Sequence, residues 1–144
     1  MKRTMKGLAG IVAGGALLTS ALVAASAAPA SAATPWRTYQ CEGLHASVSY
    51  RVTNSWNTGF LGEVRIENSG DVIRNWELTW DWTGAQHVAG VGGVGYTQIG
   101  RTVYVNGLPH NSDVPAAGQL GFDFNSGGEA AVPDAFTLQG AVCA

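Results

Sequence analysis

Lysine is nearly absent from this chain, and the two lysines that it has, Lys2 and Lys6, lie within the first six residues. Beyond Lys6 the basic side chains are five arginines, against ten acidic residues. Residues 33–144 therefore carry a formal net charge of −5 with histidine neutral. Such a surface repels phosphate backbones and anionic lipid, so we expect neither a nucleic-acid partner nor a membrane partner.

A long apolar run is missing after the first thirty residues. The first six residues contain three basic side chains, an apolar stretch rich in Ala, Gly and Leu runs from Leu8 to Val23, and Ala30-Ser31-Ala32 is the best small-x-small cleavage site. The stretch is short for a bilayer span, and no second one follows. We predict a signal peptide over residues 1–32 and a secreted, extracellular protein without an anchor. Residues 33–144 then have the length of a single domain, which we expect to be monomeric.

Cysteine is also scarce, since the chain contains only Cys41 and Cys143. Two thiols in an exported chain favour a disulfide, here between the first and last strands, although a reactive thiol pair is the alternative. Closing a loop of about 100 residues stabilises a fold by up to roughly 4.7 kcal/mol in the chain-entropy model. We expect Cys41 and Cys143 to form a structural disulfide.

No segment of residues 33–144 repeats with a long helical period. Apolar residues instead alternate with polar ones in short segments, which are separated by clusters of Gly, Asn, Ser and Asp. Segments of this kind are 48–52, 64–66, 76–82, 103–105, 120–124 and 136–138. Period-two alternation with a turn every ten residues or so predicts an all-β antiparallel β-sandwich.

Three tryptophans, Trp76, Trp80 and Trp82, share one face of a predicted strand with Leu78. They could form a binding surface or fill the space between two sheets. Together they could bury several hundred Å². We therefore assign them to the core.

Groups suited to catalysis do not occur in a useful pattern. Glycoside hydrolysis needs two carboxylates flanking one bond, but several carboxylates alternate with core residues and so point to solvent: Glu63, Glu67, Glu77, Asp81 and Asp123. The histidines (His45, His87 and His110) lack metal-ligand spacing, and no Gly-x-Ser-x-Gly elbow is present. A polysaccharide-cleaving copper monooxygenase would begin with His after cleavage, and His45 lies far beyond Ala32. We therefore expect that the protein is not an enzyme and that it binds no cofactor and no metal.

The segment Gly90–Gly95 fits the pattern G-x-G-x-x-G. This motif binds a pyrophosphate only where it opens a helix. Here the strand-like segments 96–99 and 102–105 follow, so we predict a flexible loop.

Trp56 stands in the segment Asn-Ser-Trp-Asn-Thr-Gly-Phe at 54–60, which is rich in turn-forming residues. A large ring placed beside a turn is either kept exposed for a partner or folded back over the sandwich edge. The residues around it leave both interpretations open.

Several motifs resemble those of family 2 carbohydrate-binding modules, the bacterial cellulose-binding domains, over residues 41–143. The most specific is Asn-x-Trp-Asn-Thr-Gly-Phe at 54–60. Supporting motifs are Val-x-Ile-x-Asn at 64–68, Asn-Trp-Glu-Leu-Thr-Trp at 75–80, Gly-Phe-x-Phe-Asn at 121–125 and Pro-x-Ala-Phe-Thr-Leu-x-Gly-x-x-Cys at 133–143. The resemblance implies a β-sandwich of the jelly-roll or immunoglobulin-like kind with about nine strands. It also implies one disulfide between the chain ends.

In the cellulose-binding branch of that family, three coplanar tryptophans stack on glucose rings. The resemblance implies that Trp56 is the first of them and that Asn54 and Asn125 hydrogen-bond the glycan. The second ring position falls on Gly92 and the third on His110, so two of the three rings are missing here. Two further polar positions are occupied by Gly90 and Gly121.

Loss of two interface tryptophans at about 2 kcal/mol each weakens binding roughly a thousandfold. His110 would remain as a marginal third contact, and Tyr96 could supply a ring near Gly92. The resemblance therefore implies a secreted, non-catalytic module that binds polysaccharide (cellulose, or else chitin or xylan) with reduced affinity. The alternative is a sandwich redirected to protein or cell-surface recognition, with glycan binding lost.

Overall fold

The computed structural model describes residues 33–144, so the predicted signal peptide over 1–32 lies outside the described residues. The described part is all-β, as predicted. Its strands are β1 (Arg37–Gln40), β2 (Ala46–Trp56), β3 (Gly59–Asn68), β4 (Ile73–Arg74), β5 (Glu77–Asp81), β6 (His87–Val91), β7 (Gly95–Ile99), β8 (Thr102–Asn106), β9 (Asp113–Val114), β10 (Gly118–Gly127), β11 (Phe136–Leu138) and β12 (Ala141–Cys143). Within residues 33–144 no helix has the length and apolarity needed to cross a membrane.

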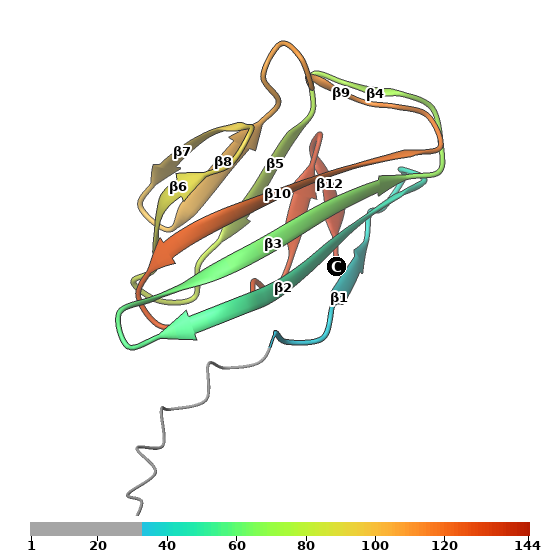
Figure 1. Cartoon of the computed structure of the whole chain (residues 1–144). Coiled ribbons are helices and arrows are strands. Elements are labelled where there is room, and N and C mark those ends of the chain that lie inside the picture. Colours follow the sequence, from blue (N-terminus) through green and yellow to red (C-terminus); the bar gives the residue numbers. More distant parts are fainter. Residues whose placement is uncertain (1–32) are drawn as a thin grey trace, which may run out of the picture.

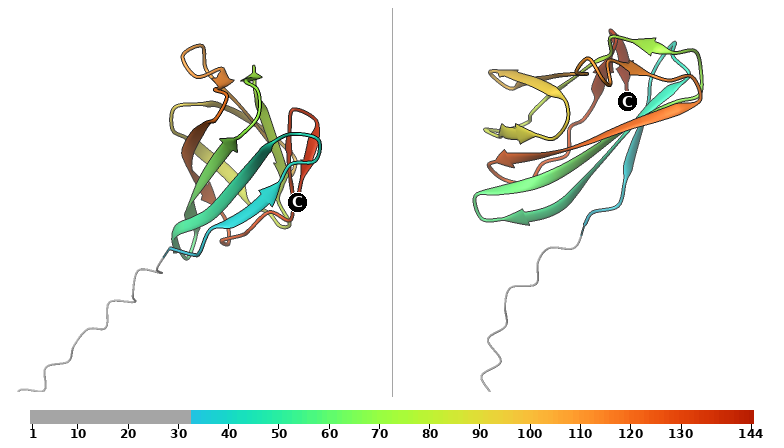
Figure 2. Two further views of the ribbon diagram at one scale, coloured as in Figure 1. Left: turned by 90° about the vertical axis from the view of Figure 1, so that its right-hand side faces the viewer. Right: turned by 45° about the horizontal axis from the view of Figure 1, so that its top comes forward.

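Two five-stranded antiparallel sheets form the layers of the sandwich (Figure 1). We call them sheet A, in the order β1-β2-β3-β10-β6, and sheet B, in the order β12-β11-β5-β8-β7. The strands β2, β3 and β10 run side by side as the long arms of sheet A, and the other views show sheet B packed behind them (Figure 2). The short pair β4–β9 joins the two layers at one end.

The core confirms the period-two prediction. Buried residues alternate along the long strands, as at Val48, Tyr50 and Val52 on β2 and at Val64 and Ile66 on β3. The predicted core tryptophans are buried, with at most 2% of their surface exposed: Trp76, Trp80 and Trp82. Because Trp80 and Trp82 contact each other edge-on and both contact Phe124, they join the two sheets.

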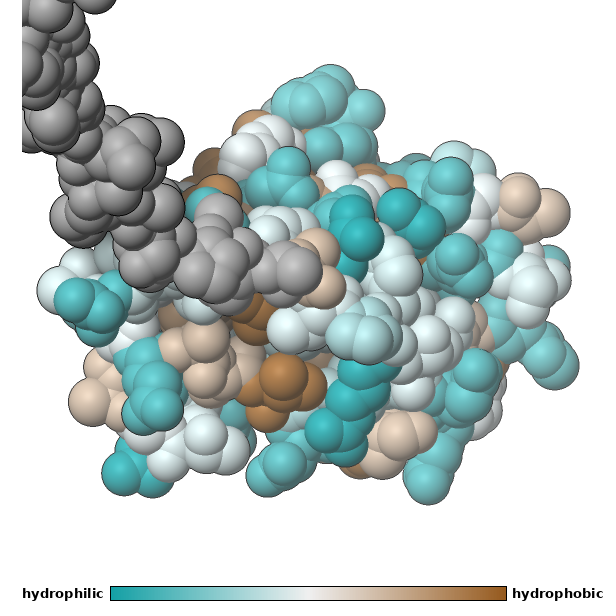
Figure 3. All heavy atoms as spheres, turned by 60° about the horizontal axis from the view of Figure 1, so that its bottom comes forward, coloured by the Kyte–Doolittle hydropathy of each residue, from teal (hydrophilic) through white to brown (hydrophobic). Residues whose placement is uncertain are grey.

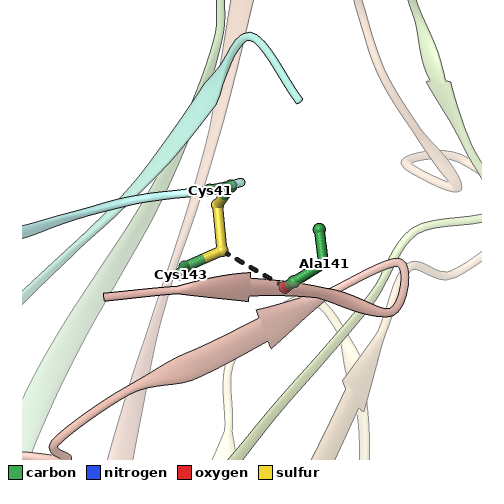
Figure 4. The surroundings of a disulfide bond; sticks show 3 residues. All are labelled: Cys41, Ala141 and Cys143. Atoms are coloured by element: carbon green, nitrogen blue, oxygen red, sulfur yellow. Dashed lines mark hydrogen bonds between the residues drawn. A yellow bond between two sulfur atoms is a disulfide. The ribbon is translucent and has the colours of Figure 1, made fainter. Parts of the chain in front are cut away.

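The predicted disulfide between Cys41 and Cys143 is present (Figure 4). It joins the residue directly after β1, at the edge of sheet A, to β12, at the edge of sheet B. Backbone hydrogen bonds run on both sides of it: Gln40 and Ala144 exchange two of 3.1 Å, and the Glu42 amide donates to the Val142 carbonyl at 2.9 Å. The edges of the two layers are thus held together at this side of the sandwich.

The opposite edge of the sandwich is closed by a side chain. The Gln98 amide on β7 accepts a hydrogen bond from the Val88 amide at 2.8 Å and donates to the Gln86 carbonyl at 3.0 Å. A sheet edge is prone to unwanted pairing. Here both outer edges of sheet A, β1 and β6, meet a partner in sheet B.

Two expectations need correction. The described residues form twelve strands, whereas the resemblance implied about nine, and the count of twelve includes the two-residue strands β4 and β9. The expected flexible loop over 90–95 is also wrong at its ends. Gly90 and Val91 belong to β6 and Gly95 opens β7, so the turn between the strands comprises only residues 92–94.

Candidate functional site

Trp56 is the last residue of β2, directly before the turn at Asn57 and Thr58. Trp56 is 48% exposed, so it belongs neither to the core nor to a covered edge. Across the hairpin it pairs with Gly59, and a Cβ added to Gly59 would lie only 3.0 Å from the ring atom Cζ2. The turn sequence therefore places the Trp56 ring against the backbone of Gly59. This contact fixes the position of the ring and leaves the ring exposed to solvent.

A row of side chains crosses sheet A beside Trp56. Asn54 on β2 pairs with Leu61 on β3, Leu61 with Asn125 on β10, and Asn125 with Gly90 on β6. Residues directly opposite in an antiparallel ladder point to the same face. Because Phe60 and Phe124 point into the core, this row lies on the outer face of sheet A, together with Trp56.

The glycine at position 90 makes room for the amide of Asn125. A Cβ on Gly90 would come within 2.8 Å of the Asn125 oxygen Oδ1. The short residue therefore lets the Asn125 side chain lie across β6. Gly90 looked from sequence only like a lost polar contact, whereas the structure gives it a steric role.

An open hollow of about 710 Å³ lies next to this row on the outer face. Leu61 is 39% exposed there and supplies apolar surface. The residues that line the hollow are Thr53, Leu61, Glu63, Gly90, Val91, Gly92, Asp123, Phe124 and Asn125. Gly92, where the resemblance places a second ring, is one of these residues and contributes no side chain to the hollow.

His110 lies on the loop between β8 and β9. Asn111 holds this loop, because its side-chain amide donates to the Gly93 carbonyl at 2.8 Å and its own carbonyl accepts from the Trp76 indole at 2.8 Å. The loop is therefore tied to the turn at residues 92–94, and His110 is exposed on it. Tyr96, 38% exposed, is on the side of β7 that also carries Gln98 and so faces β6.

Sequence reasoning missed two residues of the outer face. Leu61 carries no motif signal, and its place emerges only from the β2–β3–β10 register. Trp36, just before β1, also lies over this face, with the guanidinium carbons of Arg51 and Arg65 at 4.5 and 4.6 Å from its ring centre. A single aromatic residue after a proline has no periodic neighbours that could have revealed it.

The surface around these residues is mixed in polarity. Figure 3 shows the side of the molecule below β2 and β3, where hydrophilic and pale side chains surround isolated hydrophobic ones. Among residues 33–144 no cluster of three or more His, Cys, Asp or Glu side chains could hold a metal ion. Burial raises the pKa of two tyrosines, Tyr39 and Tyr50, which both lie in the core.

A β-sandwich with an exposed tryptophan and amide side chains on one sheet face has the form of a carbohydrate-binding module. The chain belongs to the cellulose binding domain family, family 2 of these modules, whose profile matches residues 46–143. The matched span begins at the first residue of β2, so β1, Cys41 and Trp36 precede it.

Related proteins are much longer than this chain. Exoglucanase A of Cellulomonas fimi is 32% identical over 97% of the chain, and exoglucanase B of the same organism is 38% identical over 82% of it. The chain spans only 16% and 11% of their respective lengths. Endoglucanase CelA of Streptomyces lividans is 33% identical over 96% of the chain, which spans 28% of that enzyme.

Solved structures share the fold. The cellulose-binding family 2 domain from ScLPMO10C is 29% identical and superposes with a TM-score of 0.53, covering 69% of this chain and 95% of that domain. The chitin-binding domain of Chi18aC from Streptomyces coelicolor, at 24% identity, superposes with a TM-score of 0.58 over 66% of this chain and 90% of that one. The second likeness, at this identity, shows the sandwich fold alone.

Proposed function

We propose that this protein binds insoluble polysaccharide through the outer face of sheet A, with Trp56 stacked on a sugar ring. The observation that carries the proposal is the half-exposed indole held against Gly59 beside the row of Asn54, Leu61 and Asn125. Pyranose rings offer an apolar C–H face to an aromatic ring and hydroxyl groups to flanking amides. Asn54 and Asn125 are the amides in this role.

Cellulose is the leading ligand, because the family is that of cellulose binding domains and two of the relatives are named exoglucanases. Chitin and xylan are the other candidates, since a chitin-binding domain has the same sandwich and a xylanase also matches. We propose that affinity is low, because Gly92 and His110 stand where two further rings would stack. His110 is then a marginal contact at the end of the face.

The module acts without catalysis in this proposal. Two carboxylates of sheet A, Glu63 and Asp123, line the open hollow, but Glu63 is paired with Arg51 at 2.7 Å. Export by a signal peptide over 1–32 would bring the monomeric module to extracellular polysaccharide. In this proposal the glycan-binding domain comprises residues 33–144.

The alternative, recognition of a protein or cell surface, would need a contiguous apolar patch. The outer face of sheet B has exposed apolar residues, but threonines separate them: in register, Val142, Thr137, Thr79, Tyr104 and Thr97 form one row across five strands. Exposed apolar area there is interrupted by polar groups. This arrangement favours the glycan proposal.

Adsorption to insoluble cellulose, chitin and xylan tests the proposal. The wild-type chain should leave the supernatant with at least one of these, and Trp56→Ala should remain in solution, because the main stacking ring is gone. Tyr104→Ala is the matched control, since Tyr104 is an exposed aromatic residue on the opposite face and should not affect adsorption. If the wild-type protein stays in the supernatant with all three polymers, the proposal fails.

A further inference from the structure

Trp36 is fixed over the outer face of sheet A by the backbone on either side of it. The Thr34 amide donates to the Val52 carbonyl at 2.8 Å, and the Val52 amide donates to Thr34 Oγ1 at 3.0 Å. On the other side, the hydroxyls of Thr38 and Ser49 are 3.0 Å apart. Tyr39 points into the core, so Thr38 and Trp36 point outward by alternation.

Two arginines support the Trp36 ring. Arg51 on β2 and Arg65 on β3 place their guanidinium carbons 4.5 and 4.6 Å from the ring centre. Both arginines are held by Glu63: Arg51 Nη2 lies 2.7 Å from Oε2, and Arg65 Nη2 lies 3.7 Å from Oε1. Guanidinium groups stack on indole faces, so this trio orients the ring, which remains half-buried with part of its surface in solvent.

Trp36 and Trp56 lie along the same outer face. Trp56 is opposite Gly59, whereas the supports of Trp36 are at the register positions Arg51–Glu63 and Ser49–Arg65. Those positions are four and six residues further along β3, which is roughly 13 to 20 Å at about 3.4 Å per residue. Between the two rings the face presents Thr53, Asn54 and Leu61, which mix polar and apolar contact.

We propose that Trp36 is a second sugar-stacking ring, and that it and Trp56 bind one polysaccharide chain running obliquely over β2 and β3. This inference rests on the proposed function, because it extends the same glycan face. A ring already oriented by two guanidinium groups loses little side-chain freedom when it binds. Trp36 lies before the span that matches the family, 46–143, so family membership does not assign it a role.

The ligand that fits is a single, flexible β-linked chain. Sheets twist by about 20° to 25° between neighbouring strands, so we expect rings over different parts of β2 and β3 to be tilted relative to each other. A flat crystal surface needs coplanar rings, whereas a single chain can follow the twist. We therefore expect Trp36 to contribute more to binding of soluble oligosaccharides and amorphous polymer than to binding of crystalline polymer.

Indole N–H signals in a ¹H–¹⁵N NMR spectrum of the full-length chain test the inference. The chain contains five tryptophans, and Trp76, Trp80 and Trp82 are buried, which makes them internal reporters of an intact fold. Cellohexaose, chitohexaose and xylohexaose are titrated in turn. With the oligosaccharide that shifts the Trp56 signal, the Trp36 signal should shift as well, at the same ligand concentration.

Variants separate a binding role from a structural one. Trp36→Ala should weaken affinity for that oligosaccharide roughly tenfold or more, with the three buried indole signals unchanged. Arg65→Gln keeps the ring but removes one support, and should weaken affinity by less than Trp36→Ala. Tyr104→Ala should match the wild type.

The two proposals fail differently. If Trp56 shifts while Trp36 does not, or if Trp36→Ala binds like the wild type, Trp36 is not part of the glycan surface and the proposed function stands. If none of the three oligosaccharides shifts Trp56, the proposed function and the inference built on it both fail.

Discussion

At the residue scale, the glycine at position 92 is the most informative position of the outer face, because it has no side chain. Gly92 lines the hollow, and a Cβ added there would meet only the Asp123 carbonyl oxygen, at 3.8 Å. Its φ is not in the left-handed region, unlike that of its neighbour Gly93 at 77°. A side chain at position 92 therefore costs no backbone strain.

Gly92→Trp should increase adsorption to crystalline cellulose, because it adds a ring beside Asn125 on the same face. A well-placed interface tryptophan contributes about 2 kcal/mol, so we expect roughly a thirtyfold tighter isotherm. Gly93→Trp is the control: it adds the same ring at a left-handed position and should lower stability. Unchanged adsorption of a folded Gly92→Trp variant would contradict the placement of the platform.

Tyr50 gives a pH prediction. Its hydroxyl donates to the Ala131 carbonyl at 2.6 Å, and burial, with a smaller effect of Tyr39, raises its pKa well above the ordinary value near 10. The folded state keeps the proton where the unfolded state loses it. This contribution to stability is therefore complete below about pH 10 and is lost as the pH rises further.

Tyr50→Phe should unfold at lower urea than the wild type at pH 8, because one buried hydrogen bond worth about 1 kcal/mol is missing. Above pH 10 its free energy of unfolding should fall less steeply than that of the wild type. Parallel curves for the two proteins up to pH 11 would show that Tyr50 ionises normally. Tyr104→Phe, at an exposed position, provides the comparison.

At the element scale, the edge strands decide how the sandwich is closed. The Cys41–Cys143 bond spans 102 residues and joins the end of β1 to β12, the edge strand of the other sheet. Four backbone partners around it, Gln40, Glu42, Val142 and Ala144, depend on the same junction. The bond therefore holds Trp36 indirectly, because Trp36 lies just before β1.

The double variant Cys41→Ala/Cys143→Ala should lose up to roughly 4.7 kcal/mol of stability, since the unfolded chain regains the freedom of a long loop. Urea unfolding of the variant should match that of the wild type with dithiothreitol present. Equal midpoints for the oxidised wild type and the variant would mean that the bond does not stabilise the fold. The reduced protein should also show a broader Trp36 indole signal.

Elements with regular alternation were predictable, and the others were not. β2, β3 and β10 bury alternate residues and were recognised from sequence, as was the burial of Trp76, Trp80 and Trp82. β1 was not, because Tyr39 is its only buried residue. Gly90 was misassigned to a loop, since its strand position follows from pairing with Asn125, and sequence spacing does not show that pairing.

The candidate site was predictable in its motif-bearing residues alone. The motif at 54–60 identified Trp56 and Asn54, and the structure puts them on one face with Asn125. Leu61 and Trp36 enter through strand register and cross-strand contact, which depend on the folded sheet. The role of His110 in binding glycan stays a prediction, and the residue lies on a loop that is tied to Gly93.

At the scale of the whole molecule, the net charge of −5 over residues 33–144 has little effect on a neutral glycan. Binding by stacking and neutral hydrogen bonds should be nearly independent of ionic strength, unlike binding to a charged partner. Salt therefore distinguishes glycan adsorption from nonspecific electrostatic capture. The same comparison separates polysaccharide from an oppositely charged protein surface.

The central claim, that Trp56 stacks on polysaccharide, is tested most directly by adsorption isotherms on one cellulose preparation for the wild type and Trp56→Ala, at 50 mM and 500 mM NaCl. We predict that the wild type binds equally at both salt concentrations and that Trp56→Ala loses roughly thirtyfold in affinity or more at both. Equal isotherms for the two proteins, or wild-type binding that disappears at high salt, would contradict the account.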